Sequence, residues 1–252
     1  MNKVLFFVLG ILFFSAVGWA SDIVDVEMAV LANDWKRVDQ LIVEVKPNTK
    51  DTGQLIKLDY WQGLAAVQTK DYLKAQDIIN NVLKNPKLDA HWRSKFYLVQ
   101  IDALFLDERY EQAVKAAEEF VKLEGKSDFL SLGYLKLARA ELKMGRWADA
   151  RKHLNKIIVE FPVSLDAQAA AQLLTEKDYF SVQVGSFGDR EKATQMLNTL
   201  KDDKENSYVI EASDKSGRKM YRVRVGRLAS IAEAQNLRDK LSKKGYPTNI
   251  FP

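Results

Sequence analysis

The sequence predicts a two-part protein of the α and α+β classes. An all-α array of helical hairpins is followed by a small domain of β-α-β-β-α-β order with a four-stranded antiparallel sheet. Three observations predict this division. An aromatic residue followed three positions later by a small or branched apolar residue recurs at a fixed period before residue 178. Near the end, two similar strand signals occur, FSVQVGSF from Phe180 and YRVRVGRL from Tyr221, and an amphipathic helical stretch follows each of them.

Residues 1–20 have the pattern of a secretory signal peptide. Lys3 precedes an apolar run over residues 4–17, and the small residues Gly18 and Ala20 stand where a cleavage site requires them. The alternative is an uncleaved anchor, because the run is close to the roughly 20 residues that cross a bilayer. Cleavage is preferred, because polar residues follow Ala20 at once. We therefore expect an exported protein of the periplasm or cell envelope, attached to a membrane only if the segment stays uncleaved.

The chain has no cysteine. A lipid-anchored lipoprotein is therefore excluded, since its attachment residue is a cysteine. An exported chain without disulfides must be held together by packing alone, which a body of this length allows.

Residues 21–177 are predicted to form stacked helical hairpins. This stretch has little strand signal, few prolines, and dense Leu, Ala, Ile and Lys at helical spacing. Its recurring aromatic residues are 37, 38 and 37 positions apart, a period typical of stacked hairpins. The small residue of each pair lets two helices approach closely and the aromatic fills the space between neighbours, so both are expected in the core. The pairs are Trp35 with Val38, Tyr72 with Ala75, Tyr110 with Ala113, and Trp147 with Ala150.

The last of these units resembles the tetratricopeptide repeat, and the earlier units match it less well. The slightly long period implies longer helices or turns, so we expect a divergent tetratricopeptide-like array. The resemblance implies a concave groove that holds a segment of a protein partner. The alternative is a helical spacer that only positions the last domain. The matching residues of the last unit are Tyr134, Leu137, Ala138, Gly145, Trp147, Ala150 and Pro162.

Residues 178–252 are predicted to form the sheet domain. Period-two alternation places the valines of the two strand signals on one face, and Gln183, Arg222 and Arg224 on the other, with Met220 at its edge. Two helices cover only one face of a four-stranded sheet, so the polar face is expected to be open to solvent or a ligand. The remaining expected elements are helices over 190–200 and 231–241, strands over 208–211 and 246–251, and a turn over 212–217.

The motifs VQVGSF at 182–187 and YRVRVG at 221–226, each with its following helix, resemble the SPOR family. This is the sporulation-related repeat domain of bacterial cell-envelope proteins, and the resemblance covers the whole C-terminal segment. It implies binding of peptidoglycan glycan strands that have lost their stem peptides, typically at the division septum.

The resemblance also implies the residues that contact the glycan. Met220 stands where some relatives have an aromatic that stacks on a sugar ring, which predicts weaker stacking, and Arg227 stands where Pro is common. We expect Arg224 to join the contact surface as the second arginine of the polar face. The candidate glycan-binding residues are Gln183, Ser186, Met220, Arg222, Arg224 and Ile250.

The chemistry of these residues fits such a ligand. Amide and hydroxyl side chains match the hydroxyls and N-acetyl groups of a glycan, and Arg222 can bind the free lactyl carboxylate of a muramic acid that has lost its peptide. From Tyr179 onward, the chain has 14 Lys and Arg against 9 Asp and Glu, so the net basicity of the protein lies in this domain.

No catalytic, metal or cofactor motif is found. The chain has only two histidines, His91 and His153, and lacks HExxH, GxSxG and GxxxxGK patterns. Adjacent carboxylates such as Glu118 and Glu119 do not make the facing pair of a glycosidase. We expect a protein that is not an enzyme and needs no cofactor.

The sequence therefore favours an exported adaptor that binds denuded glycan strands through its SPOR domain and recruits envelope or division proteins through its repeats. The alternative is a protein-interaction scaffold whose SPOR domain has little or no glycan binding. RNA binding is disfavoured, because the open face lacks the stacking aromatics of RNA-recognition modules and the signal segment directs the chain to export.

Overall fold

A computed structural model describes residues 22–123, 125, 127–214 and 216–251. The segment interpreted as a signal peptide, residues 1–20, lies outside this range. Within the range, every helix is too short or too polar to cross a membrane.

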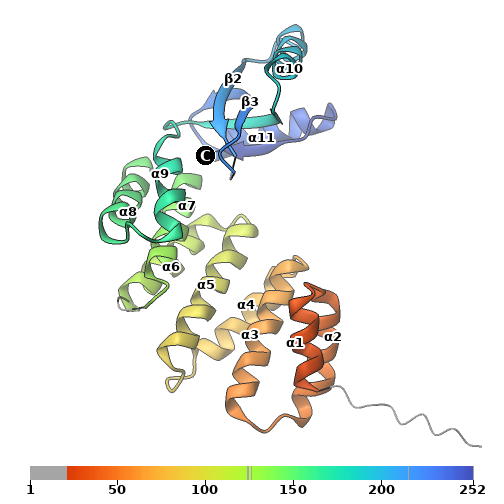
Figure 1. The fold of residues 1–252 in the computed structure, drawn as a ribbon, viewed down its shortest axis with the longest axis vertical. Helices are drawn as coiled ribbons and strands as arrows, with labels where there is room; N and C mark the ends of the chain where they lie inside the picture. Colours follow the sequence, from red (N-terminus) through yellow and green to blue (C-terminus); the bar gives the residue numbers. More distant parts are fainter. Residues whose placement is uncertain (1–21, 124, 126, 215, 252) are drawn as a thin grey trace, which may run out of the picture.

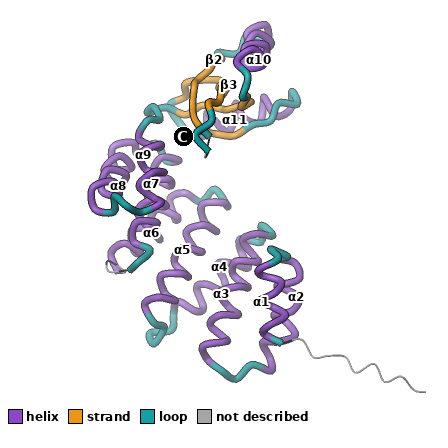
Figure 2. The backbone as a smooth tube through the Cα atoms, in the orientation of Figure 1, coloured by secondary structure: helices purple, strands orange, loops and turns teal. Residues whose placement is uncertain are grey.

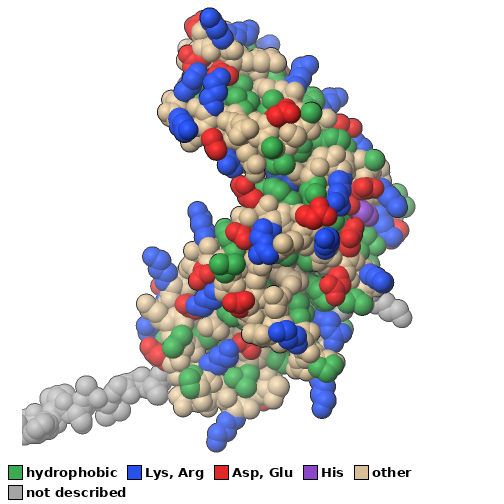
Figure 3. Space-filling model, turned by 180° about the vertical axis from the view of Figure 1, so that it is seen from behind, with side chains coloured by type: hydrophobic (Ala, Val, Ile, Leu, Met, Phe, Trp, Pro, Cys, Tyr) green, Lys and Arg blue, Asp and Glu red, His purple; other side chains and the backbone are tan. Residues whose placement is uncertain are grey.

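The first part of the protein is a curved stack of helical hairpins with the sheet domain at its far end (Figure 1). Each helix packs on the next one along the chain, and the apolar core runs between them as a series of clusters. A space-filling view shows the molecule hollowed on one side, between the sheet domain and the array (Figure 3). The helices are α1 (Ile23–Leu31), α2 (Trp35–Val45), the short 3-10 helix η1 (Lys46–Asn48), α3 (Thr52–Gln68), α4 (Tyr72–Leu83), α5 (Ala90–Leu106), α6 (Tyr110–Leu123), α7 (Leu130–Lys143), α8 (Trp147–Glu160) and α9 (Leu165–Leu174).

The recurring aromatic residue begins the second helix of each hairpin, because α2, α4, α6 and α8 start at the four predicted aromatics. Their small partners are fully buried, as expected, whereas the aromatics themselves are only partly buried. Two residues before each aromatic, the chain turns through a left-handed conformation that ends the preceding helix. Gly145 takes this position in the last unit, but Asn33, Lys70 and Glu108 take it in the others. The earlier units therefore lack the glycine signal of the repeat although they share its turn.

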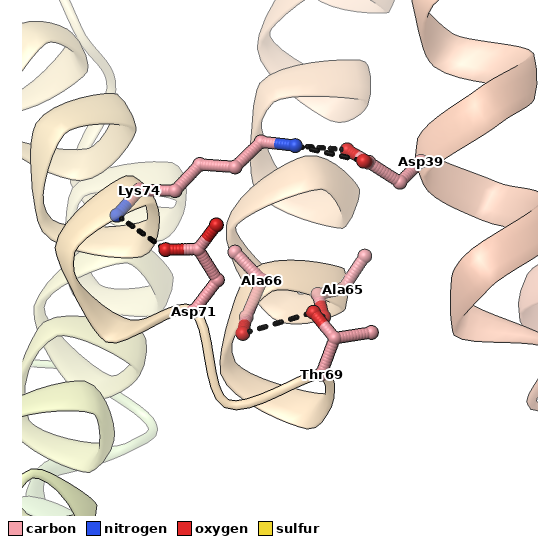
Figure 4. A network of polar contacts seen from close by, with 6 residues as sticks. All are labelled: Asp39, Ala65, Ala66, Thr69, Asp71 and Lys74. Atoms are coloured by element: carbon pink, nitrogen blue, oxygen red, sulfur yellow. Dashed lines mark hydrogen bonds and ion pairs between the residues drawn. The ribbon is translucent and has the colours of Figure 1, made fainter.

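Polar contacts join each hairpin to the next one. Lys74 of α4 reaches back to Asp39 of α2, with both carboxylate oxygens at 2.7 Å from its Nζ (Figure 4). The backbone N–H of the same Lys74 donates to the side chain of Asp71, which caps α4. One unit further on, Arg109 donates to Gln76 at 2.7 Å, and Arg146 pairs with Glu111 at 2.9 Å. Each of these contacts connects the second helix of one hairpin to the next hairpin along the chain.

The last part is a four-stranded antiparallel sheet, as predicted (Figure 2). Its strand order is β2-β3-β1-β4. Helices α10 (Arg190–Asp202) and α11 (Ile231–Lys243) contact the sheet from one face. The valines of β1 and β3 pack there against Ala193, Leu200 and Leu241, and all of them are buried. The strands are β1 (Phe180–Phe187), β2 (Ser207–Ser213), β3 (Lys219–Leu228) and β4 (Asn249–Phe251).

The ends of two strands differ from the prediction. The β2–β3 hairpin closes later than expected, because Oδ1 of Asp214 accepts from the backbone N–H groups of Ser216 and Arg218 and makes the turn there. Strand β4 is shorter than the expected 246–251. The chain leaves α11 through Gly245 at φ 86°, and Pro247 has no N–H to offer a sheet, so pairing begins only at Asn249.

Two buried glycines, Gly133 in α7 and Gly63 in α3, offer a matched test of the packing between helices. A Cβ at Gly133 would lie 2.1 Å from Cε1 of Phe120, which is fully buried, whereas a Cβ at Gly63 meets only ordinary contacts with Ile79 from 3.5 Å. We expect Gly133→Ala to lower the free energy of unfolding by about 1–3 kcal/mol through overpacking. Gly63→Ala should be neutral or stabilising by up to about 1 kcal/mol, because alanine favours the helix.

Chemical denaturation of the two variants and the parent protein measures both effects. Equal stability of the two variants would contradict the packing described for α6 and α7.

Candidate functional site

The register of the sheet brings most of the predicted site residues together on the face away from α10 and α11. Gln183 pairs with Arg224 and Ser186 pairs with Arg222 between β1 and β3. Met220 pairs with Ala212 of β2 and shares the face of Arg222, two residues along the same strand. Ser186 is exposed, and Met220 and Arg222 are partly exposed. Among the described residues, Arg222 makes no ion pair.

Strand β2 supplies two residues of this face that the sequence reasoning did not single out. Tyr208 lies opposite Arg224, and Ile210 lies opposite Arg222. The alternation of polar and apolar residues along β2 is weak, but the pairing of β2 with β3 would have indicated both residues. Burial raises the pKa of Tyr208 to about 12, so its hydroxyl stays neutral.

Arg224 does not present a free guanidinium, which corrects the expectation that it lies exposed beside Arg222. Only 4% of the residue is exposed, and its Nη1 and Nη2 lie 2.7 and 3.0 Å from the two carboxylate oxygens of Glu176. The ring of Phe251 lies 4.4 Å from the centre of the same guanidinium. Glu176 belongs to the link between α9 and β1, so this link covers the middle of the face that was expected to be open.

The expected position of Ile250 also needs correction. Ile250 pairs with Val182, and its side chain packs with the apolar cluster between the sheet and its two helices. Its neighbours Asn249 and Phe251 pair with Gln183 and Ser181, and therefore lie on the polar face. The pairing of β4 with residues 181–183 of β1 sets this register, which alternation along β4 alone does not determine.

A groove remains beside the covered part of the face. It has a volume of about 560 Å³ and runs between the link and strands β2 and β3. Arg222, Arg224 and Ile210 line its floor, and Glu176, Lys177 and Tyr179 line the wall formed by the link. Both parts of the protein therefore contribute side chains to the groove.

The sheet domain is docked on the last repeats through several further contacts. The rings of Trp147 and Phe180 lie 4.9 Å apart, and Nζ of Lys143 donates to the carbonyl oxygen of Ile250 at 2.8 Å. Arg238 of α11 pairs with Glu108 at 3.0 Å. These contacts hold the groove walls in place without using the side chains of the groove floor.

The two histidines do not form a reactive site. Nδ1 of His153 lies 2.8 Å from Oε2 of Glu141, a buried carboxylate, and its ring stacks on Tyr134. His91 packs against Phe129 and Trp92. No group of three or more His, Asp or Glu side chains with metal-binding geometry occurs in the part of the chain that the structure describes.

Comparison with protein families agrees with this architecture. Residues 176–251 match the SPOR domain, and residues 133–164, which hold most of α7 and all of α8, match the tetratricopeptide repeat. No curated protein matches the chain. The C-terminal part is therefore a SPOR domain, which implies peptidoglycan binding in the cell envelope, and the repeat implies protein interaction. Both are non-catalytic binding domains.

The stability of the folded protein is expected to depend on pH through Lys143, which lies where the sheet domain docks on the array. Burial lowers the pKa of Lys143 to about 8, although the nearby Glu108 opposes the change. Between about pH 8 and 10.5, the unfolded chain then binds more protons at this residue than the folded chain does, so the folded state gains stability as the pH rises. Lys143→Met removes this gain.

We expect the stability of the parent protein relative to Lys143→Met to increase by about 1–3 kcal/mol from pH 7 to pH 10. Denaturant unfolding of both proteins at the two pH values measures the difference. A difference in unfolding free energy between the two proteins that is the same at pH 7 and pH 10 would contradict the burial of Lys143.

Proposed function

We propose that this protein is an exported adaptor of the cell envelope. Its SPOR domain binds denuded peptidoglycan strands at the division septum, and its helical repeats recruit envelope or division proteins. The observation that carries the proposal is the partly exposed guanidinium of Arg222, which has no ion-pair partner within the described part of the chain and lies beside Ser186, on the sheet face away from the helices and at the groove.

The chemistry of Arg222 supports the choice of ligand. A muramic acid that has lost its stem peptide has a free carboxylate, and a guanidinium binds a carboxylate through charge-assisted hydrogen bonds. The hydroxyl of Ser186 and the amide of Gln183 supply donors and acceptors that suit sugar hydroxyls and N-acetyl groups. The excess of Lys and Arg over Asp and Glu from Tyr179 onward adds long-range attraction for an acidic polymer.

The shape of the groove supports selectivity for bare strands. The link forms a wall along the strands, and stem peptides that branch from a glycan strand toward this wall would collide with its side chains. Tyr179, which lines the wall, supplies an aromatic ring beside Arg227, at the opposite end of β3 from Met220.

One observation favours the alternative of a protein-interaction scaffold with little glycan binding. Met220 lacks an aromatic surface for a sugar, and Arg224 is already neutralised by Glu176, so the face offers fewer free contacts than expected. In this alternative, the docked sheet domain serves as the end of the repeat array.

A binding assay separates the two functions. We expect the full chain to bind amidase-treated sacculi more strongly than intact sacculi, and Arg222→Ala to weaken binding to the treated sacculi by about tenfold or more, since a hydrogen bond to a charged group contributes about 1.5–3 kcal/mol. Arg218→Ala is the matched control, because it removes the same charge from an 80% exposed side chain at the β2–β3 turn.

Co-sedimentation with the two preparations of sacculi measures these differences. Equal binding to both, or an equal loss in both arginine variants, would speak for a surface that attracts any acidic material and against the proposed site.

A further inference from the structure

The bidentate contact between Arg224 and Glu176 has the geometry of a carboxylate-binding site. Two nitrogens of one planar guanidinium face two oxygens of one carboxylate at 2.7 and 3.0 Å. The guanidinium also lies over the ring of Phe251 at 4.4 Å, which holds its plane in a fixed orientation. The side chain of Arg224 is only 5% exposed, whereas that of Glu176 is 20% exposed. The carboxylate is thus the more accessible partner.

We infer that Arg224 is a second carboxylate subsite of the groove, which Glu176 occupies in the ligand-free protein. A carboxylate of the bound glycan strand replaces Glu176 on Arg224, while Arg222 binds the strand in the open part of the groove. This inference rests on the proposed function, because it takes the same acidic glycan as the ligand.

Unsatisfied polar atoms support a ligand at this place. Nε of Arg224 and Oε1 of Gln183 are buried and have no hydrogen-bond partner among the described residues. Each buried polar atom without a partner costs about 1–3 kcal/mol. Gln183 pairs directly with Arg224 in the sheet, so both atoms belong to the part of the polar face where Glu176 is bound, and a ligand group gains access to them only when Glu176 moves away. A glycan supplies the hydroxyl, amide and carboxylate groups that they lack.

The link that carries Glu176 is held by contacts independent of Arg224. Arg151 of α8 donates to the backbone carbonyls of Leu174 and Glu176, and pairs with Asp178. The Glu176 carboxylate can therefore leave Arg224 by rotation of its own side chain, with the backbone still anchored on the last repeat. Exchange of carboxylates requires no separation of the two domains.

The two subsites differ in their cost of occupation. Arg222 is unpaired and binds a carboxylate directly, whereas Arg224 first releases Glu176. Both arginines lie on one face of β3, two residues apart, which at about 3.4 Å per residue separates them by about 7 Å. A ligand with more than one carboxylate can therefore contact both arginines, whereas a sugar with a single carboxylate contacts only one of them.

The test removes the negative charge of Glu176, which competes with the carboxylate of the glycan for Arg224. Glu176→Gln keeps the length and an acceptor oxygen of the side chain but no longer neutralises Arg224. We expect the full-length variant to bind amidase-treated sacculi about tenfold more tightly than the parent protein. Glu108→Gln is the matched control, because it removes a carboxylate that also bridges the repeats and the sheet domain, through Arg238, but lies outside the groove lining. Its binding should equal that of the parent.

A second pair of variants keeps the test valid if Glu176→Gln does not fold. Glu176→Asp retains the charge that buried Arg224 requires but shortens the side chain, and we expect a smaller increase in binding. In the double variant Glu176→Gln with Arg224→Gln, the increase should disappear. Thermal unfolding of each variant shows which ones are folded.

The outcomes separate this inference from the proposed function. Unchanged or weaker binding by folded Glu176→Gln or Glu176→Asp overturns the subsite, even if Arg222→Ala still reduces binding and supports the function. An increase that persists in the double variant also overturns it. Failure of the parent and all variants to bind treated sacculi overturns both proposals.

Discussion

The arrangement of this protein depends on the burial of one guanidinium. A buried charge is strongly destabilising unless an opposite charge and hydrogen bonds accompany it. On the sheet, the neighbours of Arg224 are Gln183 and Tyr208, and neither carries a charge. The compensating carboxylate comes from Glu176, outside the sheet. The sheet domain must therefore sit where the link from the last repeat passes over its polar face, and the groove follows from this position.

The other contacts between the two parts agree with a single docking arrangement. Trp147 is the repeat aromatic of the last hairpin, and its ring also packs at a tilt against Phe180 at the start of β1. The same residue that begins α8 thus joins the array to the sheet. The link of residues 175–178 has no glycine or proline, and Arg151 holds it at two backbone carbonyls. The orientation of the polar sheet face is therefore set by its contacts with the last repeats, and the link adds side chains to the groove beside this face.

Much of the fold was predictable because its signals are local. The spacing of aromatic and small residues marked the start of each second helix, and alternation along β1 and β3 indicated which side chains share a face. The ends of β2 and β4 were not predictable in the same way. The β2–β3 turn depends on which residues Asp214 binds, and the start of β4 depends on how the chain leaves α11 at Gly245. The pairing of β4 with β1 then decides which residues of β4 lie on the polar face.

In the candidate site, strand alternation predicts which side chains share a face but not which of them are accessible. Alternation along β1 and β3 places Gln183 and Arg222 on one face, as the pairing of the two strands shows. Ser186 was named only from the family resemblance, and it reaches the same face because a bulge after Gln183 shifts the register of β1. Alternation assigns Arg224 to the same face, but it says nothing about what covers that face. The residue that covers Arg224 is Glu176 of the link, and it does so by pairing its carboxylate with the guanidinium. A signal for it is nevertheless present in the sequence: a short link with two carboxylates, Glu176 and Asp178, directly precedes a sheet that has an arginine in the middle of its polar face. Where a charge lies on the central strands of a small sheet, acidic residues in the adjoining link are the first candidates for its partner.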